Sequence, residues 1–182
     1  MIRIRVQPVK MRERNNLILL LGIAALTSCQ SAGQTDDVFT RQQRDASTFS
    51  VRITGHREKR SFGQVLGGAN YVFEAKNVAA PDWKKFLVVA SDDPEPIAEK
   101  NIGIGGEKIG YVFKNKKFAV TTDAAKNWSI WDVTQMPSLN SDRSCIIENV
   151  SISTNGQGKM ELRCGVSSRM LSTTDFGVRW ND

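Results

Sequence analysis

The residues of this chain whose side chains most often do chemistry are three cysteines and one histidine. Cys29 follows an apolar segment near the N-terminus, whereas Cys145 and Cys164 lie in the C-terminal third. His56 begins the charged run HREKR over residues 56–60. With one histidine and no CxxC pair, the sequence lacks the nitrogen and sulfur ligands of an ordinary zinc site.

Sequence motifs for nucleophilic or phosphate chemistry are also absent. There is no G-x-S-x-G nucleophile elbow. The glycine-rich segment 101–106 (NIGIGG) is not followed by GK[ST], so it predicts a strand edge or a bend rather than a phosphate loop. Residues 92–95 (DDPE) predict a solvated loop rather than a calcium site. The sequence therefore predicts a protein that is not an enzyme and that holds no cofactor or metal.

The context of Cys29 indicates export. Residues 17–26 (LILLLGIAAL) are uncharged and follow a charged start, but ten residues are too few to span a bilayer about 30 Å thick as a helix. Leu26-Thr27-Ser28-Cys29 come next. This tetrapeptide resembles the lipobox of bacterial lipoproteins, in which the cysteine is acylated and becomes the first residue of the mature chain. The resemblance implies that residues 1–28 are a signal peptide.

The same resemblance implies a lipid anchor in the cell envelope. Two or more acyl chains hold a protein stably on a bilayer, whereas one chain holds it marginally. Gln30, which stands where an aspartate would retain enterobacterial lipoproteins in the inner membrane, implies an outer-membrane location facing the periplasm. Residues 1–10 are not needed for a signal of normal proportions, so we expect translation to start at Met11.

The net charge of +6 is concentrated in the segment that would be removed. Residues 1–28 contain five of the 25 basic residues and one of the 19 acidic residues, so the rest of the chain carries only +2. A nucleic-acid partner would need a basic stripe with interleaved aromatics on the mature domain. The remaining basic cluster, residues 114–117 (KNKK), predicts a solvated hairpin turn, and we expect no nucleic-acid partner.

The mature chain divides into two parts. Residues 29–47 are polar and predict a flexible tether, with a short helical turn around residues 39–44. Residues 48–182 contain short alternating runs broken by turn residues, which predict an all-β domain. Two hairpins are expected, over residues 111–120 around Asn115 and over residues 149–162 at Asn155-Gly156.

Two segments of this domain repeat each other without gaps, and their aspartates are 52 residues apart. The matching positions are Thr121, Asp123, Ala125 and Trp128 in the first copy, and Thr173, Asp175, Gly177 and Trp180 in the second. The pattern resembles the Asp-box, S/T-x-D-x-G-x-T-W, of sialidases and other BNR-repeat β-propellers. The first copy has Ala125 in place of the glycine, and neither has threonine before the tryptophan. The resemblance implies structural turns away from any active site.

The resemblance also narrows the expected fold. The carboxylate should accept backbone N–H groups two or three residues on, and the tryptophan should fill the space between neighbouring strands. About 135 residues supply three blades of 40–50 residues, whereas closed propellers have four to eight. We therefore expect antiparallel hairpins of a partial β-propeller or of a β-sandwich, or a piece completed by assembly. The whole combination resembles small uncharacterised Gram-negative lipoproteins.

Cys145 and Cys164 remain once Cys29 is assigned to lipid. Two cysteines in an oxidising compartment favour a disulfide. If the hairpin pairs Ile152 with Met160, Cys164 faces residue 148, and Cys145 falls on the other side of the sheet. A β-bulge near residues 146–147 would correct this register.

Three functions fit these features. The first is an anchored protein-binding module whose partner is an envelope or secreted protein; some lipoproteins of this kind are immunity proteins that block secreted lipases. The second is an envelope structural or assembly factor, and the third is a glycan-binding protein of sialidase-like ancestry. Trp83, which follows Pro81-Asp82 in a predicted loop, is the candidate binding residue.

Overall fold

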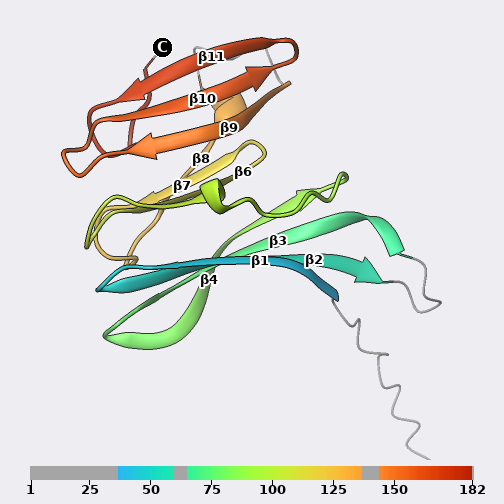
Figure 1. Cartoon of the computed structure of the whole chain (residues 1–182), viewed down its shortest axis with the longest axis horizontal. Coiled ribbons are helices and arrows are strands. Elements are labelled where there is room, and N and C mark those ends of the chain that lie inside the picture. The colour runs from blue at the N-terminus through green and yellow to red at the C-terminus, as the bar shows by residue number, and fades with distance from the viewer. Residues whose placement is uncertain (1–36, 60–64, 137–143, 182) are drawn as a thin grey trace, which may run out of the picture. The chain divides into compact units, whose positions relative to one another are not determined.

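The computed structural model describes residues 37–59, 65–136 and 144–181, in which the regular structure is β-strand apart from two 3-10 turns, Glu99–Asn101 and Val133–Gln135. The strands form three antiparallel sheets, and each sheet follows chain order (Figure 1). The first contains β1 (Asp37–Asp45), β2 (Phe49–Lys59), β3 (Val65–Asn77) and β4 (Ala80–Ser91). The second contains β5 (Ile102–Ile104), β6 (Gly110–Lys114), β7 (Lys117–Thr121) and β8 (Ser129–Asp132). The third contains β9 (Cys145–Ile152), β10 (Gly158–Cys164) and β11 (Ser167–Thr173). The all-β prediction is confirmed.

The second sheet lies between the other two and is buried on both faces (Figure 1). Val112 and Ala119 face the first sheet and belong to the first core, whereas Phe113 and Phe118 face the third sheet and belong to the second core. All five residues of β6 are buried, as expected for a strand that is covered on both sides. The described residues form one compact unit around these two cores.

The first strand corrects the predicted tether. Residues 37–45, assigned to the tether with a helical turn at 39–44, form β1 and pair with β2. Most β1 side chains are exposed, so the sequence has little of the apolar alternation by which a strand is recognised. The tertiary pairing therefore decides the structure of this segment.

Both predicted hairpins are present. Asn115 turns the β6–β7 hairpin with a φ of 54°, and Gly156 turns the β9–β10 hairpin with a φ of 87°. The expectation that residues 114–117 are solvated is wrong for Lys114, which is 5% exposed. Its ammonium lies 4.8 Å from the centre of the Tyr71 ring and 3.4 Å from a Glu95 carboxylate oxygen.

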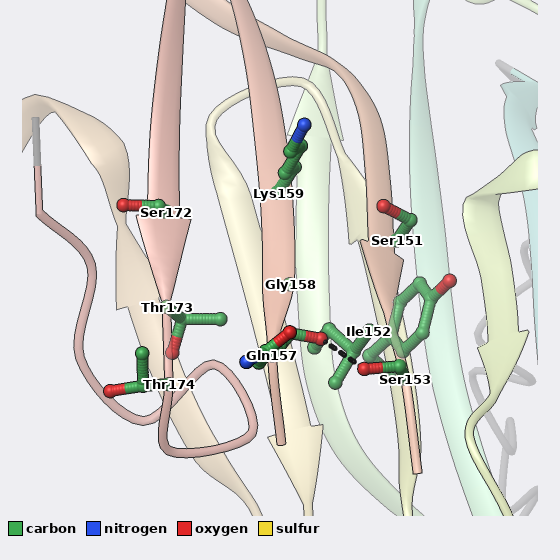
Figure 2. Close-up of a pocket in the computed structure, with 10 residues that line it drawn as sticks. Ser151, Ile152, Ser153, Gln157, Gly158, Lys159, Ser172, Thr173 and Thr174 are labelled. Carbon is green, nitrogen blue, oxygen red and sulfur yellow. Dashed lines mark hydrogen bonds between the residues drawn. The ribbon is translucent and has the colours of Figure 1, made fainter. Parts of the chain in front are cut away.

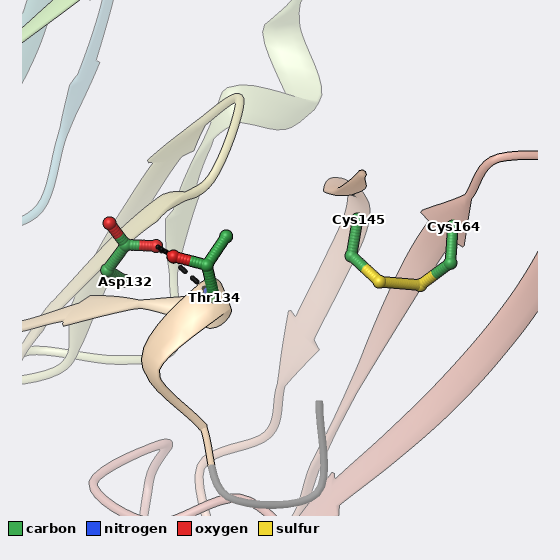
Figure 3. Close-up of a disulfide and its surroundings, with 4 residues drawn as sticks. All are labelled: Asp132, Thr134, Cys145 and Cys164. Carbon is green, nitrogen blue, oxygen red and sulfur yellow. Dashed lines mark hydrogen bonds between the residues drawn. A yellow bond between two sulfur atoms is a disulfide. The ribbon is translucent and has the colours of Figure 1, made fainter. Parts of the chain in front are cut away.

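A disulfide joins Cys145 in β9 to Cys164 in β10, as Figure 3 shows. The predicted register was wrong by two residues, because Val150 rather than Ile152 pairs with Met160. A bulge leaves residue 148 without an opposite residue and brings the two cysteines into register. The bulge that the disulfide required is therefore present, one residue beyond the predicted position.

Candidate functional site

The first repeated turn, residues 121–128, connects β7 to β8 and is closed by two side chains. The Thr121 hydroxyl donates to Asp123 Oδ1 at 2.9 Å and accepts from the N–H of Ala125 at 3.0 Å. The Asp123 carboxylate accepts from the backbone N–H of Asn127 at 2.9 Å and from its side-chain amide at 2.7 Å. Burial raises the pKa of Asp123, but these hydrogen bonds outweigh it and hold the pKa below its usual value.

The second repeated turn, residues 173–180, follows β11 and shares the hydrogen bonds of the threonine hydroxyl and of the backbone N–H groups. The Thr173 hydroxyl donates to Asp175 Oδ1 at 2.8 Å and accepts from the N–H of Gly177 at 3.0 Å. The same carboxylate oxygen accepts from the N–H of Arg179 at 2.8 Å. In both turns the carboxylate accepts from the N–H of the residue four positions on, and Asp123 also interacts with the backbone of Lys126, three positions on, within the expected range. Both carboxylates are engaged within their own turns.

The tryptophans of the two turns join neighbouring sheets rather than neighbouring strands. Trp128, at the edge of the second sheet, stacks on Phe86 of the first sheet with ring centres 4.0 Å apart and planes within 5°. Trp180, which follows the third sheet, makes an edge-on contact with Phe118 of the second sheet, and their ring centres are 5.5 Å apart. Each turn therefore anchors its sheet to the sheet before it in the chain.

The two turns differ at the position where Ala125 replaces glycine. Ala125 has a φ of 65° and Gly177 a φ of 82°, so both lie in the left-handed region that disfavours a side chain. A Cβ atom on Gly177 would come within 2.9 Å of Ile152 and 3.1 Å of Phe118. Ala125, which carries a Cβ atom at the equivalent position, lines a hollow. The departure from the repeat therefore coincides with open space between the first and second sheets.

This space, which we call the lysine-rimmed hollow, has a volume of about 320 Å³ and lies between the β3–β4 connection and the first repeated turn. Apolar lining is supplied by Phe86, Trp128 and several alanines, and the charged residues that line it are Lys76, Lys84, Lys126 and Asp82. Within the described ranges, none of the three lysines forms an ion pair with a carboxylate. Three lysines against one aspartate among the lining residues favour a negatively charged ligand.

Asn77 holds the two walls of the lysine-rimmed hollow together. Its side-chain amide donates to the carbonyl oxygen of Ala124 in the first repeated turn at 2.7 Å. Its side-chain oxygen accepts from the N–H of Ala79 in the β3–β4 connection at 2.9 Å. Phe86 is held in place by an edge-on contact with Phe73 of the first core, with ring centres 6.3 Å apart. The hollow is therefore preformed rather than dependent on a mobile side chain.

Trp83, predicted in a loop, lies in β4 next to the lysine-rimmed hollow and is half-buried. The Arg52 guanidinium lies 4.1 Å from the ring centre and the Lys76 ammonium 5.0 Å. Arg52 is also paired with Glu74 at 2.6 Å. Because Lys76 contacts Trp83 and also lines the hollow, the two features form one continuous surface.

A second hollow, of about 550 Å³, crosses the end of the third sheet (Figure 2). Ser151, Lys159 and Ser172 stand side by side on β9, β10 and β11, because they are partners in the strand register. Ser153 and Thr174 complete this hydroxyl-lined hollow. Thr173 also lines it, but its hydroxyl is bonded within the second repeated turn. It contains one ammonium and no carboxylate among its lining residues, so it is polar and weakly cationic.

The predicted lipid anchor and the single histidine lie away from both hollows or outside the described residues. Cys29, the lipobox and Met11 lie outside the described residues. His56 lies in β2, and nowhere in the described ranges do three or more His, Cys, Asp or Glu side chains gather as metal ligands would. Residues 37–59, 65–136 and 144–181 contain no helix long and apolar enough to cross a membrane.

Comparison with known proteins gives no match to a protein family, to a curated protein or to a solved structure. Sequence reasoning missed the lysine-rimmed hollow, because its lysines are spread over 51 positions, from Lys76 to Lys126, and no motif joins them. The one available signal was Ala125, the residue that breaks the repeat.

Proposed function

We propose that this protein is a bacterial envelope lipoprotein, acylated at Cys29, whose β domain binds an acidic partner protein. The observation that carries the binding role is the lysine-rimmed hollow. Its apolar lining can take an aliphatic or aromatic side chain, while Lys84 and Lys126 pair with carboxylates beside it. Charge complementarity of this kind speeds association and selects the partner, and the buried apolar contact supplies the affinity.

We infer further that the domain is a three-bladed, open relative of the β-propeller, with Asp-box turns at residues 121–128 and 173–180. The support is the stack of three meander sheets and the hydrogen bonds that the two turns share. The outer face of the first sheet carries Arg52 and Glu74, and that of the third carries Arg163, paired with Glu148. Polar end faces let a stack of repeats end without closing into a ring, as capping repeats do.

The binding role is tested by a charge-neutralised variant. Lys84→Gln/Lys126→Gln removes two exposed ammonium groups from the lysine-rimmed hollow without touching a core. The matched control, Lys100→Gln/Lys108→Gln, removes the same charge elsewhere on the surface, outside both hollows. We expect the immobilised wild-type domain and the control to retain the same acidic protein from envelope extract, and the hollow variant to lose it. Equal retention by both variants would refute the role of the hollow.

Anchoring at Cys29 is tested separately. Wild type should incorporate labelled fatty acid and sediment with membranes, whereas Cys29→Ser should do neither. Label that persists in Cys29→Ser would contradict the assignment. If the retained partner is a secreted toxin, inhibition of its enzyme activity by this protein would establish an immunity role; a resident envelope component would indicate assembly instead.

A second candidate function, glycan binding, is favoured by the hydroxyl-lined hollow. Hydroxyl groups can donate to and accept from sugar hydroxyls, and Lys159 suits an acidic sugar. Retention on an acidic glycan that is lost in Lys159→Gln but kept in Lys84→Gln/Lys126→Gln would favour this function over protein binding.

A further inference from the structure

β11 is an edge strand, and the bridge between Ser172 and Asn181 shows which of its backbone groups point outward. Ser172 donates its N–H to the carbonyl oxygen of Asn181 at 2.8 Å and accepts from the Asn181 N–H at 2.9 Å. Backbone groups of an antiparallel strand point alternately to either side. Because β11 pairs with β10 without a bulge, the N–H and C=O of Ser168 and Met170 point to the same outer edge as those of Ser172. No residue in the described part of the chain pairs with these two.

The equivalent edge in the second sheet is covered. A shift of 52 residues places β7 on β11, and the bridge between Val120 and Ser129 then coincides with the bridge between Ser172 and Asn181. After Ser129, β8 continues along β7, and Trp131 pairs with Phe118. The structure thus contains an example of the strand that this edge geometry accepts.

The covered edge also indicates the chemistry of such a strand. Lys117 in β7 pairs in register with Asp132 in β8, and the Lys117 ammonium lies 2.9 Å from the carboxylate. The same shift places Arg169 at the position of Lys117. A strand on β11 would therefore bring a carboxylate opposite Arg169, in the register in which Asp132 meets Lys117.

We propose that β11 accepts a fourth strand from a partner protein, as an extended segment that runs antiparallel to β11 and carries an acidic residue opposite Arg169. Addition of a strand to an open sheet edge is a common mode of peptide recognition, in which main-chain hydrogen bonds supply affinity. Met170, which is 53% exposed, offers an apolar contact on the outer face of the added strand. The site is separate from the lysine-rimmed hollow and does not depend on it.

Two alternatives are less compatible with the structure. The opposite edge of the third sheet is engaged, since the N–H of Ile147 in β9 donates to the carbonyl oxygen of Asn115 at 2.7 Å. A second copy that paired through Ser168 and Met170 would place Arg169 directly opposite its own counterpart, and like charges in that position destabilise a strand pair.

The probe for this site is the synthetic peptide IWDVTQ, the sequence of residues 130–135, because Asn181 already occupies the position opposite Ser172. The control peptide is IWKVTQ. The protein, starting at residue 32, is followed by NMR and by amide hydrogen exchange. We expect IWDVTQ to slow exchange at Ser168 and Met170 by about tenfold at saturation, with IWKVTQ binding more weakly. Leu171, whose N–H points toward β10, should show little change.

Two variants at Met170 distinguish the contribution of its backbone N–H to peptide binding from the contribution of its side chain. Met170→Pro removes the outward N–H and should abolish peptide binding, whereas Met170→Thr keeps it and should bind the peptide. Ser168→Pro tests the same point if Met170→Pro does not fold. The proposal is overturned if Met170→Pro and Ser168→Pro bind the peptide as tightly as wild type. It is also overturned if the two amides are already protected in the free protein, or if light scattering shows a dimer that Met170→Pro dissociates.

Discussion

Ala125 and Gly177 occupy equivalent positions in the two repeated turns, so exchanging their residue types should have opposite effects on stability. Ala125→Gly places a glycine where the backbone has a φ of 65°. Gly177→Ala places a Cβ atom at a φ of 82°, within 2.9 Å of Ile152 and 3.1 Å of Phe118. The first change relieves an unfavourable backbone conformation, and the second creates one in a crowded site.

The magnitudes follow from two opposing terms. A non-glycine residue in the left-handed region costs about 1–2 kcal/mol, while a glycine in place of alanine loses about 0.4–1 kcal/mol through the greater entropy of the unfolded chain. Ala125→Gly should therefore raise the free energy of unfolding by about 0.5–1 kcal/mol. Gly177→Ala adds a steric cost of about 1–3 kcal/mol, for a net loss of about 2–4 kcal/mol.

Chemical denaturation followed by tryptophan fluorescence measures both changes. Ala98→Gly is the matched control, because Ala98 is exposed and has an ordinary φ of −79°. It should lower the free energy of unfolding by about 0.4–1 kcal/mol. If Ala125→Gly destabilises the protein as much as Ala98→Gly does, or if Gly177→Ala is neutral, the account of the two turns is wrong.

Three further outcomes are expected. Cys145→Ala/Cys164→Ala should lower the free energy of unfolding by about 3 kcal/mol in the chain-entropy account, whereas reducing agent should have no effect on that variant; a smaller loss than 1 kcal/mol would contradict it. Phe118→Ala should cost about 3–5 kcal/mol in denaturant unfolding, because the side chain is fully buried between two sheets; a loss below 1 kcal/mol would contradict this packing. The pKa of Asp123 is lowered on folding, so its stabilising contribution is present above the unfolded pKa of about 4 and is lost as the pH falls through the folded pKa. The stability difference between wild type and Asp123→Asn should therefore shrink in acid, and a constant difference from pH 6 to pH 2 would refute it.

The paired cysteines show how far local reasoning extends. The prediction of a disulfide needed only two cysteines in a chain that is predicted to be exported, and it recognised that a regular hairpin would separate them. The register still came out wrong by two residues, because the Asn155-Gly156 turn occupies a five-residue loop closed between Ser153 and Gln157. Loop geometry and the packing of both sheet faces decide the register together, and neither can be read from strand propensity.

The repeated turns were predictable for a related reason. Threonine, aspartate, a small residue and tryptophan act over eight consecutive positions, so their spacing in the sequence determines their hydrogen bonds. What the tryptophan contacts is a different matter. Trp128 meets Phe86, and Trp180 meets Phe118, across boundaries between sheets that the spacing cannot specify.

The sequence alone determined the β-strand content, the hairpins and the repeated turns, because each depends on residues close together in the chain. Only the tertiary structure decided that residues 37–45 form a strand, that Lys114 is buried and that Lys76, Lys84 and Lys126 line one hollow. These features depend on residues distant in sequence that become neighbours when the three sheets stack. The open edge of β11 belongs to the same group, because the pairing of all the strands decides which strand lies at the edge of a sheet.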